Sequence, residues 1–210
     1  MRRVLPLLAV LSLAFAPAPL PRSKAQGHAT PQACFRAYLA AKQVGDWRAY
    51  VACLTDDAVA VRNAYFLYLA AHVAEETTEV MRKHGVSRQQ LDDALESWPQ
   101  ARRRLDASVR GAADWEAYDR AARRLCVAIE DQRGFAADVM AALFANLRRD
   151  DVRYEVTREQ RAGRYARLTV EFVSGPNRVV WAVRCVKISG GWKMMGLSLA
   201  ASISPPLPDE

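Results

Sequence analysis

Apolar residues recur every three or four positions between residues 30 and 149, and this spacing predicts an almost entirely helical segment. Thr30, followed by Pro31, begins the first helix, and Gly45 ends it. Asp46 caps a short second helix. We expect these two helices to form a tight hairpin about Gly45.

Four further helices are expected before residue 150. Thr55 with its two following acids caps the first of them, and Ser87 with Gln90 forms a capping box for the second, which ends at Pro99. Asp114 caps the third. The expected ranges are 55–84, 87–98, 114–129 and 135–149; residues 100–110 are compatible with helix or loop.

From residue 152 the apolar period changes to two, which predicts strands. The clearest is 166–172, where Ala166, Leu168, Val170 and Phe172 alternate with polar neighbours. The other strands are expected at 152–156, at 179–185 and from Trp192 onward. Short turns between them predict a four-stranded antiparallel meander over 152–200. The fold class is therefore α+β, with helices 30–149 packed on one sheet face.

The N-terminus reads as a signal peptide. Arg2 and Arg3 precede an apolar run at 4–16, and Ser23-Lys24-Ala25 before Gln26 is the best cleavage site. An uncleaved anchor is the alternative. We expect a secreted or periplasmic protein with one domain at 26–201 and a disordered tail at 202–210.

Removal of the signal peptide changes the charge argument. The whole chain has a formal charge of +7, and loss of residues 1–25 with their four basic groups leaves +3. The remaining arginine pairs stand beside acids in helical patterns, so nucleic-acid binding is not expected. No later segment is apolar enough to span a membrane.

No catalytic motif and no metal-ligand spacing is present, so we expect no catalytic residue, no metal and no cofactor. His28 lies in a polar leader, and His84 lies at a helix end, where the helix dipole favours it. His72 is expected to be a hydrogen-bonded core residue. Asp56 and Asp57 are the best carboxylate pair, and helix capping is their expected role.

Four segments resemble the nuclear transport factor 2-like superfamily of cone-shaped α+β domains: CFRAYLAA at 34–41, GDWRAY at 45–50, LTDDAV at 54–59 and SGGWKM at 189–194. The chain is similar to exported bacterial proteins of that type with an enlarged helical middle and no assigned activity. The superfamily contains isomerases, dehydratases and polyketide cyclases as well as non-enzymatic modules, so the resemblance alone fixes no reaction.

A cone domain implies a pocket lined by aromatic residues of the first helices and the sheet. The candidates are Trp47, Tyr50, Tyr65, Trp181 and Trp192, and plain core packing is the alternative. Because the inward positions of the sheet are mostly apolar, we favour a non-catalytic exported module that binds a small apolar ligand or a protein partner. A small cone-fold enzyme, an isomerase, dehydratase or hydrolase, is the alternative.

Four cysteines in an exported chain allow three disulfide pairings. Cys34 lies near the start of the first expected helix and Cys53 near the end of the second. When the hairpin folds antiparallel about Gly45, the two residues come roughly opposite each other. Cys126 and Cys185 remain as the second pair. Four buried free thiols are the alternative.

Overall fold

The computed structural model describes residues 28–72, 74–107, 115–145, 153–174 and 177–199. The expected signal peptide, the Asp114 cap and the expected tail lie outside these residues. The helices are α1 Pro31–Val44, α2 Trp47–Ala52, α3 Asp56–Ala70, α4 Ala74–Lys83, α5 Arg88–Ala107, α6 Trp115–Cys126 and α7 Gln132–Phe144. The strands are β1 Arg153–Ala162, β2 Tyr165–Ser174, β3 Asn177–Ile188 and β4 Gly191–Leu199. The predicted α+β class is confirmed.

The α1–α2 hairpin forms as its local signals predict. The Thr30 hydroxyl accepts a hydrogen bond from the Ala33 amide at 3.0 Å, and the Asp46 carboxylate accepts one from the Ala49 amide at 3.0 Å. Gly45 ends α1 with φ at 73°, a left-handed conformation that glycine adopts without a Cβ clash.

The single helix expected over 55–84 is wrong, because the chain turns at Ala71 and His72 and forms two helices. At about 1.5 Å per residue a continuous helix would carry its second half far past the core. The turn instead lets α4 pack on α7, where Met81 is buried and the ring of His84 lies 2.8 Å from the Asp138 carboxylate. The packing of α4 on α7 therefore explains why the helix ends at Ala70 and a new one begins at Ala74.

The expected helix end before Pro99 is also wrong, since α5 continues through it to Ala107. A proline inside a helix costs about 3 kcal/mol because it removes a hydrogen bond and crowds the preceding turn. Burial of Ala94 and Trp98 in the core, where α5 packs on α3 and α6, offsets this cost.

The last helix begins and ends earlier than expected. Asp131 caps α7 by accepting a hydrogen bond from the Gly134 amide at 2.8 Å. A Cβ on Gly134 would lie 2.1 Å from an Asp131 carboxylate oxygen, so the cap requires glycine there. The expected start at residue 135 is therefore three residues late, and Gly134 lies inside the first turn.

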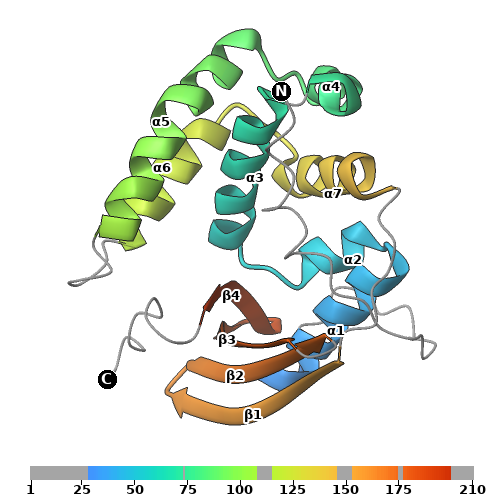
Figure 1. Cartoon of the computed structure of the whole chain (residues 1–210), viewed down its shortest axis with the longest axis vertical. Helices are drawn as coiled ribbons and strands as arrows, with labels where there is room; N and C mark the ends of the chain where they lie inside the picture. Colours follow the sequence, from blue (N-terminus) through green and yellow to red (C-terminus); the bar gives the residue numbers. More distant parts are fainter. Residues whose placement is uncertain (1–27, 73, 108–114, 146–152, 175–176, 200–210) are drawn as a thin grey trace.

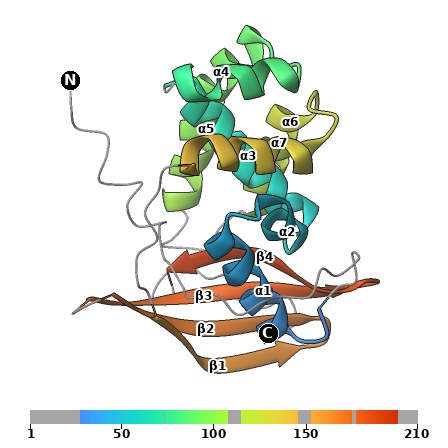
Figure 2. The same cartoon turned by 90° about the vertical axis from the view of Figure 1, so that its right-hand side faces the viewer.

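The four strands form one antiparallel sheet in the order β1-β2-β3-β4, which confirms the predicted meander. The alternate residues Ala166, Leu168, Val170 and Phe172 are buried, as predicted. Helix α1 packs against β2, β3 and β4, and α4 to α7 lie farther from the strands (Figures 1 and 2). Among the described residues, no helix combines the length and the apolar character that crossing a membrane requires.

Candidate functional site

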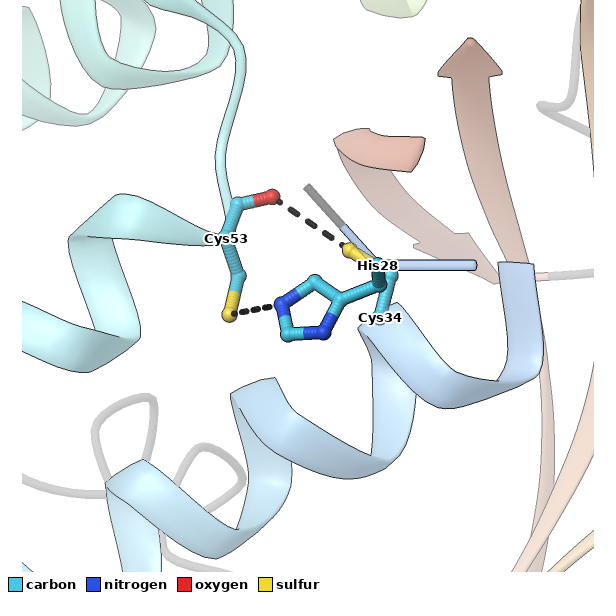
Figure 3. Close-up of side chains that lie close together, drawn as sticks. All are labelled: His28, Cys34 and Cys53. Atoms are coloured by element: carbon cyan, nitrogen blue, oxygen red, sulfur yellow. Dashed lines mark hydrogen bonds between the residues drawn. The ribbon is translucent and has the colours of Figure 1, made fainter. Parts of the chain in front are cut away.

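The most distinctive chemistry in the described residues lies where the hairpin meets β4. His28, Cys34 and Cys53 place one imidazole nitrogen and two sulfur atoms within 4.8 Å of one another. Cys34 belongs to the first turn of α1, Cys53 follows the last residue of α2, and His28 precedes α1. Figure 3 shows the His28 ring directed at the Cys53 sulfur.

Strand β4 fixes two of these three residues through its backbone. The Trp192 amide donates to the His28 carbonyl at 2.9 Å, and the Met194 amide donates to the Cys53 carbonyl at 2.8 Å. The Thr55 amide in turn donates to the Met194 carbonyl at 2.9 Å. Backbone hydrogen bonds to β4 therefore hold His28 and Cys53 in place, although both lie just outside the helices.

The side chains are close but not bonded. The Cys53 sulfur lies 3.6 Å from His28 Nε2 and donates to the Ala49 carbonyl at 3.4 Å. The Cys34 thiol donates to the Cys53 carbonyl at 3.6 Å (Figure 3). Zinc–sulfur bonds of about 2.3 Å in a tetrahedral site put two ligand sulfurs about 3.8 Å apart. The observed spacing thus needs only a small contraction to hold one ion.

The electrostatics of the cluster make Cys53 easier to ionise and keep the His28 imidazole neutral. A hydrogen bond from Cys34 and the nearby Lys193 ammonium lower the pKa of Cys53, although burial opposes this. The hydrogen bond to Cys53 and burial raise the pKa of Cys34. Burial and Lys193 lower the pKa of His28, so its imidazole is uncharged at neutral pH.

The two expected disulfides are not formed, since all four cysteines are buried free thiols. The structure brings Cys34 and Cys53 together, as the hairpin geometry predicts. It does not bring Cys126 and Cys185 together. Cys126 donates to the Ala60 carbonyl of α3 at 3.4 Å, whereas Cys185 lies in β3 near Cys34.

The five aromatic pocket candidates are scattered through the fold. Tyr50 is buried and Trp47 packs on it, Tyr65 contacts Phe66, Trp181 contacts Phe172, and Trp192 lies under Arg161. None of them lines the shallow depression of about 470 Å³ between α1 and β1. Its lining residues are Gln32, Arg36, Tyr154, Glu155 and Val156.

Tyr50 belongs instead to a buried polar cluster that the sequence does not reveal. Its hydroxyl lies 2.5 Å from the Tyr38 hydroxyl, and the Arg62 guanidinium lies 4.9 Å from its ring centre. Burial, together with the Arg62 charge, lowers the pKa of Lys42 to about 8. This cluster joins α1, α2 and α3 across their contact.

The other predicted polar residues have structural surroundings. Asp56 pairs with Arg133 and Asp57 with Arg123, each at 2.6 Å. Both acids lie in the first turn of α3, whose N-cap is Thr55. The prediction for His72 is wrong, because it is exposed in the turn after α3. Its ring packs edge-to-face against the Tyr68 ring, with 4.8 Å between the ring centroids.

Asp119 on α6 is a perturbed acid that the sequence does not single out. Burial and the nearby Asp57 raise its pKa to about 6, while Arg123 and Arg184 act in the opposite direction. A raised pKa means that folding favours the protonated carboxyl. Stability is therefore full below the unfolded pKa of 3.8 and falls as the pH rises toward 6.

We predict that Asp119→Asn raises the melting temperature at pH 7 and flattens the fall in stability between pH 4 and 6. Partial exposure screens the effect, so the expected rise is about 2–4 °C. Thermal unfolding across this pH range measures it. Asp93→Asn removes the same charge from an exposed position on α5 and controls for net charge. An unchanged melting temperature at pH 7 would show that the Asp119 carboxylate is not strained by its surroundings.

Comparison with models of protein families, with characterised proteins and with solved structures finds no match to this chain. The site must therefore be interpreted from its own geometry. The sequence pattern missed the His28–Cys34–Cys53 set because its members follow no metal motif and come from three elements. The sequence indicated only that Cys34 and Cys53 come together in the hairpin, and it did not indicate that His28 joins them.

Proposed function

We propose that the chain is an exported, non-catalytic binding module whose ligand is a soft metal ion held by His28, Cys34 and Cys53. The observation that carries the proposal is the convergence of three nitrogen and sulfur donors within 4.8 Å. Such donors select zinc or copper over magnesium and calcium, which prefer oxygen. Membership of the nuclear transport factor 2-like superfamily is part of the proposal, and the hairpin packed on a four-stranded meander supports it.

The protonation states suit metal binding. A ligand imidazole must be neutral and a ligand sulfur must be a thiolate. The lowered pKa of His28 meets the first requirement, and the lowered pKa of Cys53 brings the second closer. The Cys34 proton leaves when the ion binds, because the ion replaces it as the partner of the sulfur.

The small apolar ligand and the protein partner have less support than the ion. The depression between α1 and β1 is lined largely by polar side chains and by none of the aromatic candidates. Tyr50 and Trp192, the two most buried candidates, serve as packing in the core.

Export gives the thiol pair a second state. In an oxidising compartment Cys34 and Cys53 can join in a disulfide, each thiol losing its hydrogen while an external disulfide is reduced. A disulfide sulfur is a poor ligand, so the oxidised protein is expected to bind no ion. The metal-bound dithiol and the disulfide are therefore exclusive states of one site.

Native mass spectrometry of the protein from the extracytoplasmic fraction tests this proposal. We expect a chain that starts at Gln26 and carries one metal ion when reduced. Treatment with oxidised glutathione should release the ion and lower the chain mass by two hydrogens. A chain starting at Met1 in that fraction would contradict cleavage before Gln26, and a reduced chain without an ion after metal addition would contradict the site.

The enzyme alternative is favoured by one observation, the Asp57 and Asp119 carboxylates near Arg123 and Arg184. A carboxyl whose pKa is raised toward neutrality is typical of a general acid. With its pKa raised to about 6, Asp119 would serve as the acid. Hydrolase and isomerase substrate panels assayed with the protein and with Asp119→Asn test this alternative, which requires a turnover that the substitution abolishes.

A further inference from the structure

Helix α7 packs on α2, and one of its side chains binds the segment that carries Cys53 (Figure 1). Arg133 lies in the first turn of α7, and its guanidinium donates to the Val51 carbonyl at 2.8 Å and to the Leu54 carbonyl at 3.1 Å. The same guanidinium pairs with the Asp56 carboxylate at 2.6 Å. Arg133 therefore binds the chain both before and after the proposed ligand.

Strand β4 binds the two carbonyls between those that Arg133 holds. The Met194 amide donates to the Cys53 carbonyl at 2.8 Å, and a lysine side chain of the same strand donates to the Ala52 carbonyl. Every carbonyl from 51 to 54 thus accepts a hydrogen bond from α7 or β4. Helix α2 has six residues, too few for a helix to hold its own end in place. Contacts from α7 and β4 therefore fix the backbone that carries the Cys53 sulfur.

A guanidinium is the side-chain group best suited to this contact. It is planar, stays charged and offers five N–H donors in a fixed geometry, so one arginine can bind two carbonyls and a carboxylate at once. An ammonium is a compact charge at the end of a flexible stem and does not have this fixed fork. Binding sites work when their groups are held to within about 0.5 Å of the required geometry.

We infer that Arg133 is a positioning residue of the metal site, which fixes Cys53 where its sulfur meets His28 and Cys34. This inference rests on the proposed function and adds that the geometry of the site is controlled from α7. Arg133 makes no bond to the ion and acts through the backbone on both sides of a ligand. Because coupling between two sites is reciprocal, a bound ion stabilises the contact between α7 and the segment 51–54.

The test compares the zinc affinity of Arg133→Gln with that of the unaltered protein, both reduced and folded, by competition with a chromophoric chelator. Loss of the guanidinium is expected to weaken binding by about 10-fold, the lower end of the range for changes outside the ligand sphere. A loss of stability alone does not have this effect, because the apparent affinity falls only in proportion to the fraction of competent protein.

Arg133→Lys keeps the positive charge but cannot bind both carbonyls in the same way, so its affinity should lie between those of Arg133→Gln and the unaltered protein. Full affinity in this variant would mean that charge, and not the bridging of two carbonyls, is what the site requires. That result would overturn the positioning role.

Arg123→Gln is the matched control. Arg123 pairs with Asp57 at 2.6 Å, just as Arg133 pairs with Asp56, and both acids lie in the first turn of α3. Arg123 belongs to α6, however, which packs on α3 and α5. This variant loses the same type of ion pair and should bind zinc as tightly as the unaltered protein does.

Cobalt in place of zinc gives a spectroscopic readout, because the sulfur-to-cobalt charge-transfer band reports the thiolates bound to the ion. The band per bound ion should be weaker in Arg133→Gln and unchanged in Arg123→Gln. Equal affinities and equal spectra for these two variants would overturn the positioning role while the metal site stands. Absence of zinc binding by the unaltered protein would instead remove the proposed function, and this inference with it.

Discussion

Cys53→Ser is expected to abolish stoichiometric metal binding by the reduced protein. The substitution keeps the size of the side chain but replaces a thiolate ligand with a hydroxyl, which stays protonated at neutral pH. In the unaltered protein the Cys53 sulfur lies 3.6 Å from His28 Nε2, and the pKa of the Cys53 thiol is lowered. Loss of this central donor leaves His28 and Cys34, too few ligands to hold an ion against a chelator.

The melting temperature reports whether the protein binds the ion, because a bound ligand stabilises the folded state. A ligand present at about 1,000 times its dissociation constant stabilises the folded state by about 4 kcal/mol. For a chain of this size that corresponds to a rise in melting temperature of roughly 10 °C. We expect this rise on metal addition to the unaltered protein and no rise for Cys53→Ser.

Cys126→Ser is the matched control. Cys126 is fully buried and donates to a backbone carbonyl, as Cys34 does, but it lies on α6 away from the cluster. This variant should keep the metal-dependent rise even if it melts at a lower temperature. An equal rise in all three proteins would mean that the ion binds elsewhere.

Phe35→Ala is expected to destabilise the fold by about 3–5 kcal/mol, the usual cost of removing a buried aromatic ring. Phe35 is fully buried where α1 crosses the sheet. Its ring meets the Tyr154 ring edge-on at 5.5 Å and the Phe172 ring at 6.3 Å. Removal of the ring therefore weakens the contact between the first helix and β1 and β2.

The measurement is urea unfolding, with the free energy extrapolated to water. Against a typical total of about 5–15 kcal/mol, the expected loss is a large fraction. Val127→Ala is the control, because Val127 is 80% exposed and its shortening should cost almost nothing. Equal effects from the two substitutions would contradict the packing of α1 on the sheet.

Local signals in the sequence predicted the parts of the fold that depend on neighbouring residues. Thr30, Gly45 and Asp46 specify the hairpin through their own caps, and the alternation over Ala166 to Phe172 specifies the buried face of β2. These features involve contacts within a few positions or a strict period. They are therefore visible without a three-dimensional structure.

Two of the parts that were wrong depend on distant contacts, and one depends on a local cap. The break after α3 follows from the packing of α4 on α7, and the passage of α5 through Pro99 follows from burial of Trp98. The start of α7 depends on the absence of a Cβ at Gly134, which leaves room for Asp131. In the first two cases the local signal is real and a tertiary contact outweighs it, whereas the start of α7 is set by a local cap three residues long.

The candidate site was only half visible for the same reason. Cys34 and Cys53 meet because a hairpin folds, which the sequence shows. His28 reaches them because its carbonyl pairs with the Trp192 amide of the last strand, which the sequence does not show. A metal site assembled by sheet pairing leaves no motif along the chain.

Anomalous diffraction from crystals of the reduced, copper-loaded protein tests the metal site most directly. We expect a single strong peak at bonding distance, about 2.0–2.3 Å, from His28 Nε2, Cys34 Sγ and Cys53 Sγ. A peak elsewhere on the molecule, or none at these three atoms while the thiols remain reduced, would contradict it.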